Sequence, residues 1–153
     1  MEATDEKCFE ILCKIIENTL EYNKEYKNYS EINIFESDLI CNNITNYINH
    51  IMILNKCHKS LVFISIIYLQ RIKSFHKNFR LIYKNFHKLF ITAMLVATKM
   101  YEDLFYNNLY WAKKASISLQ ELNKLEMVFI YAIKFDLVVT EEEYNDFISF
   151  ILK

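Results

Sequence analysis

Apolar side chains recur every three or four residues along most of the chain, which is the spacing of one face of an α-helix. Residues 4–29 carry one apolar stripe of this kind, and Leu39 to Ile51 repeat it with asparagines on the opposite side. The stretches 58–74 and 86–102 are apolar nearly all round, as in helices at the centre of a bundle. The pattern predicts an all-α protein with two central helices surrounded by amphipathic ones.

Two later helices have marked starting points. Ser118 is followed three residues later by Glu121, and Thr140 by Glu143. In such a capping box the hydroxyl and the carboxylate each accept a hydrogen bond from a backbone N–H that the helix leaves unpaired. We therefore expect a helix to begin after each of these residues. The segment before the first box, residues 105–117, lacks apolar periodicity and is predicted to be irregular.

The chain is predicted to have an accessory N-terminal part and one main domain. Residues 28–37 are polar and poorly periodic, so the first helix looks separable from the rest of the chain. We expect the next helix to begin near Ser37 or Asp38, since either side chain can cap it. The predicted division is an accessory helix with its linker over residues 1–36 and a five-helix domain over 37–153.

Glycine and proline are both absent from the 153 residues. Without helix breakers and without glycine for tight hairpins, helices are favoured over a β-sheet protein. A glycine-rich phosphate loop and a dinucleotide-binding fingerprint are excluded. Turns that need a positive φ are expected to rely mainly on asparagine, the next most tolerant residue.

No pattern in the chain indicates catalysis or a bound cofactor. The four cysteines form no Cys-x-x-Cys pair, and their spacing to the four histidines matches no zinc signature. We expect reduced thiols packed as small apolar groups, an intracellular location in the nucleus or cytoplasm, and no cofactor. The charged N-terminus does not resemble a signal peptide, and the longest apolar runs are half a membrane span, so no membrane partner is expected. No nucleophile–base or paired-carboxylate motif appears, so neither an enzyme nor a small-molecule substrate is expected.

The net charge is only −1, but the charges are unevenly placed. Residues 39–101 contain no acid and nine lysines or arginines, whereas both flanking parts are rich in acids. Four of these cations alternate with aromatic residues and could form a patch for an acidic or phosphorylated substrate: Lys77, Arg80, Lys84 and Lys88. An alternative is nucleic-acid binding through the basic segment 71–88, with stacking on the aromatic rings. The sequence pI of about 6.4 makes that alternative the less favoured one.

Several stretches resemble the cyclin box, a five-helix fold. The stretch IIYLQRI at 66–72 resembles a characteristic cyclin helix, and TAMLVATKMYED at 92–103 resembles the segment that carries the family's lysine. The stretches YNNLYWAKKASIS and ELNKLEMVFIYAIKFDLVVT resemble PHO-type cyclins, also called P-type or U-type, which have a single box. Lys114 and Ala115 stand where the family usually has two glycines. The apolar docking patch of cell-cycle cyclins has no counterpart in LICNNITNYINHI.

The resemblance implies an all-α fold, namely a five-helix cyclin box with an additional N-terminal helix. It also implies a regulatory subunit that binds and activates a cyclin-dependent protein kinase by packing against the kinase's regulatory helix. The residues matching the family's kinase contacts are Lys99, Met100, Glu126 and Phe135, and those matching structural positions of the box are Arg71 and Asp103. The alternative within the same fold is a scaffold or transcription-related protein that binds nucleic acid.

The spacing of Lys99 and Glu126 alone permits two interpretations. Each lies at the rim of an apolar helix face, so the two could simply form an internal ion pair. They could instead satisfy backbone carbonyl and N–H groups of a partner, as the cyclin resemblance implies. The N-terminal helix could pack on the box, contact the kinase or mediate self-association, and the sequence leaves these three open.

Overall fold

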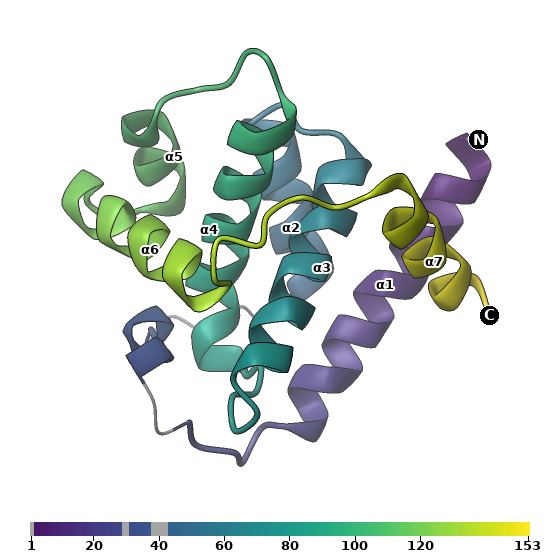
Figure 1. Ribbon diagram of the computed structural model, residues 1–153, viewed down its shortest axis with the longest axis horizontal. Helices are drawn as coiled ribbons and strands as arrows, with labels where there is room; N and C mark the ends of the chain where they lie inside the picture. Colours follow the sequence, from purple (N-terminus) through teal and green to yellow (C-terminus); the bar gives the residue numbers. More distant parts are fainter. Residues whose placement is uncertain (1, 29–30, 38–42) are drawn as a thin grey trace.

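The structure is a computed structural model that describes residues 2–28, 31–37 and 43–153 (Figure 1). Over these residues every regular element is a helix and no β-strand occurs, which confirms the predicted all-α class. The elements in chain order are α1 (Glu2–Tyr22), the 3₁₀ helix η1 (Glu31–Phe35), α2 (Ile44–Leu54), α3 (Lys59–Phe75), α4 (Tyr83–Tyr101), α5 (Asn108–Ala115), α6 (Leu119–Ala132) and α7 (Glu141–Leu152).

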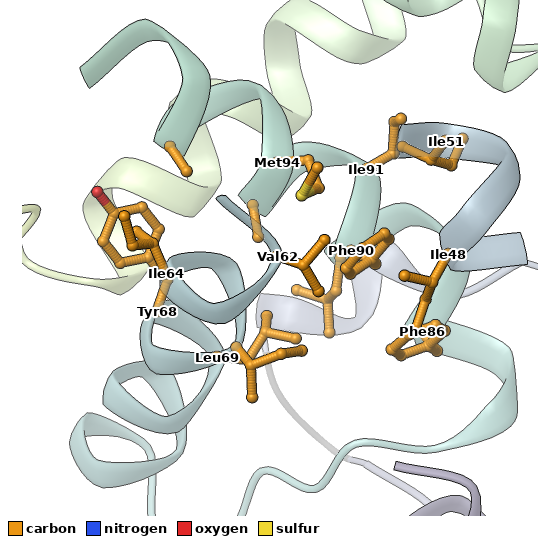
Figure 2. Close-up of a cluster of buried hydrophobic side chains, with 14 of the residues drawn as sticks. Ile48, Ile51, Val62, Ile64, Tyr68, Leu69, Phe86, Phe90, Ile91 and Met94 are labelled. Carbon is orange, nitrogen blue, oxygen red and sulfur yellow. The ribbon is translucent and has the colours of Figure 1, made fainter. Parts of the chain in front are cut away.

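Helices α3 and α4 form the centre of the molecule, as their apolar sequences predict. They pack against each other, and the remaining elements cover their outer sides: α5, α6 and η1 contact α4, while α7 contacts α3. Figure 2 shows side chains of α2, α3 and α4 meeting in the core, among them Ile48, Val62, Phe90 and Met94. A helix surrounded in this way needs apolar residues on every side.

The N-terminal helix is part of the same core. Helix α1 ends at Tyr22, earlier than the predicted 29, and it packs against α7 and α2. Its apolar stripe is buried: Cys8, Phe9, Leu12, Cys13, Ile16 and Leu20. Within the polar segment after α1, Phe35 of η1 is fully buried and packs edge-to-face on Phe129 of α6. The predicted separability of this part is therefore not seen in the packing, and the boundary at 36/37 stays a prediction.

Both predicted helix starts are confirmed, although only half of each capping box forms. The Ser118 hydroxyl accepts a hydrogen bond from the Glu121 N–H at 3.0 Å, and the Thr140 hydroxyl accepts one from the Glu143 N–H at 3.1 Å. The carboxylate of Glu121 binds Lys88, and that of Glu143 binds Arg71. These two carboxylates therefore connect helices in the tertiary structure.

Two further predictions about elements were wrong. The segment before Ser118 was expected to be irregular, yet it contains α5, which the Asn107 side chain caps by accepting from the Tyr110 N–H. Helix α2 begins at Ile44, because Asn43 is its extended N-cap residue, so Ser37 lies outside this helix. The other proposed cap, Asp38, lies outside the described residues.

The prediction that asparagine would fill positions of positive φ was also wrong for the described residues. Positive φ angles occur at Lys56, Ser116, Lys134 and Phe135. Ser116 ends α5 in the left-handed conformation at φ 59°. The left-handed turn thus forms directly after Lys114 and Ala115 without any glycine.

Candidate functional site

Lys99 and Glu126 meet, although they come from different helices. Lys99 lies in the last turn of α4 and Glu126 in the middle of α6, and the Lys99 Nζ donates to the Glu126 Oε2 at 2.8 Å. The side chains are 32% and 17% exposed, so solvent reaches both charges at the rim of the core. A cation in the last turn also interacts favourably with the negative end of the α4 dipole.

The second carboxylate oxygen of Glu126 is held by α5. The Asn108 Nδ2 donates to the Glu126 Oε1 at 2.9 Å and also lies 2.8 Å from the Asn123 Oδ1. Glu126 therefore has one fixed partner on each oxygen, which restricts its rotamer. Asn108 is part of the motif that resembles PHO-type cyclins, but its contact with Glu126 was not foreseen from the sequence.

The paired charges keep capacity for a further partner. An ammonium group has three donors, and each carboxylate oxygen has two lone pairs. Within the described residues, the Lys99 ammonium makes one hydrogen bond and each Glu126 oxygen accepts one. The pair could therefore donate to a carbonyl and accept from an N–H of another chain without breaking its internal bond.

Exposed apolar side chains are found on the two helices that carry this pair and on the segments that directly follow these helices. Met100 is 43% exposed and Phe135 is 63% exposed. The Phe135 ring packs edge-to-face on Tyr131, with centroids 5.1 Å apart. We give the name α4–α6 surface to the pair together with seven exposed apolar residues of α4, of α6 and of the segments directly after these helices: Lys99, Met100, Leu104, Phe105, Glu126, Met127, Tyr131, Phe135 and Val138.

Arg71 clamps the segment that connects α6 to α7. Its Nη1 donates to the Asp136 carbonyl at 2.6 Å, its Nη2 donates to the Val138 carbonyl at 2.8 Å, and it also pairs with Glu143. Figure 1 shows this segment crossing in front of α4 and α3 toward α7. Arg71 thus fixes the backbone just after Phe135, and its assignment as a structural position of the box stays a prediction.

Two tyrosines, one on α3 and one on α4, bind the same segment. The Tyr68 hydroxyl donates to the Leu137 carbonyl at 2.6 Å, and burial raises the pKa of Tyr68, so the phenol stays protonated and can donate. The Tyr101 hydroxyl accepts from the Val139 N–H at 2.6 Å. Asp103, in contrast, is exposed and its side chain makes no hydrogen bond or ion pair within the described residues, so its structural role stays a prediction.

A comparison with known protein families shows which family has this fold. A family model described as Cyclin matches residues 11–137.

This chain belongs to the cyclin family.

The proteins that are similar to this chain include PHO-type cyclins of plants and yeast. The chain is 34% identical over 110 residues to Cyclin-U4-1 of Arabidopsis thaliana, covering 72% of this chain and 54% of the relative. It is 36% identical over 104 residues to Cyclin-P4-1 of Oryza sativa subsp. japonica, covering 68% of this chain and 49% of that protein. It is 42% identical over 69 residues to PHO85 cyclin-7 of Saccharomyces cerevisiae, covering 45% of this chain and 24% of that protein. The chain thus spans about half the length of the plant relatives.

The residues matched by the family model differ from the predicted bounds of the domain, and which five helices form the box stays a prediction. Helices α2 to α6 lie wholly inside the matched residues, which begin within α1 and end before α7. The predicted set counted the last helix and omitted α5. The fold class itself, a cyclin box with an additional N-terminal helix, is confirmed.

The four basic residues of the predicted patch have different surroundings in this cyclin, and the patch stays a prediction. Lys88 pairs with Glu121 at 2.5 Å, and the Arg80 guanidinium lies over the Tyr26 ring at 4.4 Å. Lys77 and Lys84 are exposed and form no ion pair within the described residues. Of the neighbouring aromatic residues, two are buried in the core and are unavailable for stacking on bases, namely Phe79 and Phe86.

The cysteines behave as packed apolar groups in the part that the structure describes. Cys8 and Cys13 are buried, and burial raises the pKa of Cys13 to about 11. Burial also raises the pKa of the Cys57 thiol, and Cys41 lies outside the described residues. Over the described residues, no three histidine, cysteine or acidic side chains are placed to hold a metal ion. Nor is any described helix both long enough and apolar enough to span a bilayer.

Proposed function

We propose that this cyclin is a regulatory, non-catalytic protein that binds and activates a cyclin-dependent protein kinase through the α4–α6 surface. The observation that carries the proposal is the Lys99–Glu126 pair, which is held by Asn108 and lies on elements that expose large apolar side chains. One relative is named as a cyclin of PHO85, which supports a partner of this class. A nuclear or cytoplasmic location accords with such a partner and stays a prediction.

The chemistry of the surface suits a partner helix and its flanking backbone. Met100 and Phe135 would be buried by the kinase, which excludes water around the two charges. Charge-assisted hydrogen bonds from Lys99 to carbonyls and from N–H groups to Glu126 are stronger in such surroundings.

Activation would follow from differential affinity. A protein kinase is active when a lysine of its sheet and a glutamate of its regulatory helix are paired and its activation loop is ordered. A rigid helical surface that binds better to the active position of that helix shifts the kinase toward the active state. The cyclin itself then needs no catalytic group.

The proposal is tested by reversing the two charges. Each of Lys99→Glu and Glu126→Lys is expected to weaken binding to purified cyclin-dependent kinases by at least tenfold in pull-down and calorimetry, because it leaves one partly buried charge facing a like charge. The matched control is Lys113→Glu, an exposed residue of α5, which should bind as the wild type does. Helix content measured by circular dichroism should be unchanged in all three.

The double variant Lys99→Glu with Glu126→Lys separates docking from folding. It rebuilds the internal ion pair with opposite polarity, so stability should return toward that of the wild type. Kinase binding should stay lost, because the partner's carbonyl and N–H groups would then face the wrong charges. If the double variant binds the kinase normally, the pair is only structural and the assigned surface is wrong.

A further inference from the structure

A groove lies on a different part of the molecule, between α1, α3 and α7. It has a volume of about 460 Å³ and opens to solvent. Its floor is apolar and comes from all three helices and from the segment after α3, for example Leu12, Ile66, Leu69, Phe79, Phe147 and Ile151. We call it the α1–α3–α7 groove, and none of its lining residues belongs to the α4–α6 surface.

The charges that line this groove have one sign. Among the described residues, Lys73 and Arg80 are its only charged lining residues, and no aspartate or glutamate lines it. Lys73 is exposed and donates to the Lys77 carbonyl at 2.7 Å, and its other two donors have no partner among the residues that the structure describes. Arg80 lies over Tyr26 and contacts the Asn23 amide oxygen at 3.5 Å. Neither cation forms an ion pair in the part of the chain that the structure describes, so the groove has positive charge that nothing described neutralises.

The rim offers apolar contacts and one unused amide. Tyr22 is 84% exposed and Phe150 is 68% exposed, although both are large and apolar. Gln70 also lines the groove, and its exposed side chain makes no hydrogen bond within the described residues. An amide side chain can donate and accept at once, which is what the backbone of a peptide requires.

We propose that the α1–α3–α7 groove binds a short segment of a partner protein in which bulky apolar side chains are followed by an acidic residue. The apolar side chains would fill the floor and be covered by Tyr22 and Phe150. The acidic residue would pair with Lys73 and Arg80, and Gln70 would bond to the segment's backbone. This site goes beyond the proposed kinase contact, since it is formed by α1, α3 and α7 and shares no lining residue with the α4–α6 surface.

Charge favours such a partner over a second copy of this chain. In a symmetric dimer the same patch faces itself. Two grooves that face each other would bring both pairs of cations into one interface without an acidic lining residue among those described to meet them. An acidic segment from another protein removes this repulsion.

The test selects peptides without assuming a sequence. A displayed library of random 12-residue peptides is panned against the full chain, and the best binder is labelled with fluorescein for anisotropy titrations. We expect selected peptides to combine Leu, Ile, Phe or Met with a neighbouring Asp or Glu, and the affinity to fall as salt is added. Lys73→Glu and Phe150→Ala should each weaken binding at least tenfold, and Lys113→Glu should not. Because Lys73 and Phe150 are exposed, both variants should keep wild-type helix content.

Two further measurements separate this site from the kinase contact. Lys99→Glu should still bind the selected peptide, and Lys73→Glu should still bind the kinase. The proposal is overturned if the selected peptides carry no acid, or if Lys73→Glu leaves their binding unchanged. It is also overturned if ultracentrifugation shows a dimer that Phe150→Ala dissociates, because the occupant of the groove is then a second copy of the chain. A third contrary result would be that Lys73→Glu and Phe150→Ala abolish binding of a fluorescent fatty acid but not of the peptide, because the occupant is then an acyl chain.

Discussion

Glu126 shows how single contacts prepare a charged side chain for a partner. Lys99 and Asn108 each occupy one of its oxygens, so the carboxylate is already oriented before anything binds. A side chain that is already oriented loses less conformational entropy when a partner binds, so the free-energy cost of docking is lower. Spacing in the sequence placed Lys99 and Glu126 at the rims of apolar helix faces and permitted an ion pair between them. The cyclin resemblance assigned both to a kinase contact, but neither line of reasoning showed that α5 supplies a third group.

Asn108→Ala is predicted to weaken kinase binding moderately. Loss of one hydrogen bond to a partly exposed carboxylate costs about 1 kcal/mol, which corresponds to roughly a fivefold weaker affinity. Calorimetry with the kinase that the wild type binds would measure this. The matched control is Asn123→Ala, which removes a contact of Asn108 but leaves its bond to Glu126; equal losses in the two variants would contradict a positioning role.

His87 makes stability depend on pH. Burial lowers the pKa of His87 below its ordinary value of 6.5, and its Nε2 is buried without a hydrogen-bond partner among the described residues. As pH falls through 6.5, the unfolded chain takes up a proton that the folded chain resists. The stability contributed by neutral His87 is thus fully present above 6.5 and is lost as pH falls toward the lowered folded pKa.

Urea unfolding at about pH 7.5 and about pH 5.5, on either side of the ordinary histidine pKa, checks this. The wild type is expected to lose more stability between these pH values than His87→Phe, which cannot take up a proton and keeps a ring beside Tyr47. The exposed His50 provides the control, since His50→Phe should lose as much stability as the wild type. An identical loss in His87→Phe would show that other groups cause the pH dependence.

At the scale of elements, periodicity revealed the long helices and missed the short ones. Helix α5 buries Trp111, Ala112 and Ala115, which is a helical spacing, but two of the three are alanines and give a weak apolar signal. The five residues of η1 are too few to show a 3.6-residue period, so Phe35 looked like an isolated aromatic in a polar linker. Tertiary packing decides both elements.

Phe35→Ala is predicted to destabilise the fold by about 3–5 kcal/mol, the usual cost of truncating a buried phenylalanine. The cost arises because Phe35 is fully buried against Phe129 and joins η1 to α4 and α6. Denaturant unfolding followed by circular dichroism would measure it. Phe150→Ala removes a mostly exposed ring and should change stability little; a similar small effect of Phe35→Ala would mean that η1 is not anchored.

At the scale of the whole molecule, the uneven charge distribution has an internal explanation. Acidic residues of the two ends pair with cations of the basic middle part: Glu6 with Lys59, Glu121 with Lys88, Glu126 with Lys99, and both Asp136 and Glu143 with Arg71. Each pair lies at the surface with at least one partly exposed partner, and surface ion pairs contribute only about 0–1 kcal/mol each. These pairs orient the helices more than they stabilise them. The basic residues of 39–101 thus serve partly as partners of acidic residues near the two ends of the chain.

The ends of the chain also cover the centre together. Helices α1 and α7 lie side by side against the rest of the molecule (Figure 1), and both contribute buried residues to the common core. A chain reduced to residues 37–153 is therefore expected to expose the surface that α1 covers. We predict a clearly lower Tm or aggregation relative to the full chain, measured by thermal unfolding and light scattering. An equally stable 37–153 would support the division predicted from the sequence and contradict a shared core.

The left-handed backbone at Phe135 has a consequence for how this cyclin can change over evolutionary time. A bulky residue at φ 58° stores roughly 1–2 kcal/mol that glycine would not. Its ring is mostly exposed, so the folded chain regains little of that energy by burying it. Selection for stability alone would replace this aromatic residue. If the proposed kinase contact holds, the strain persists because the ring contributes its energy only in the complex, and the free subunit stays less stable than its fold allows.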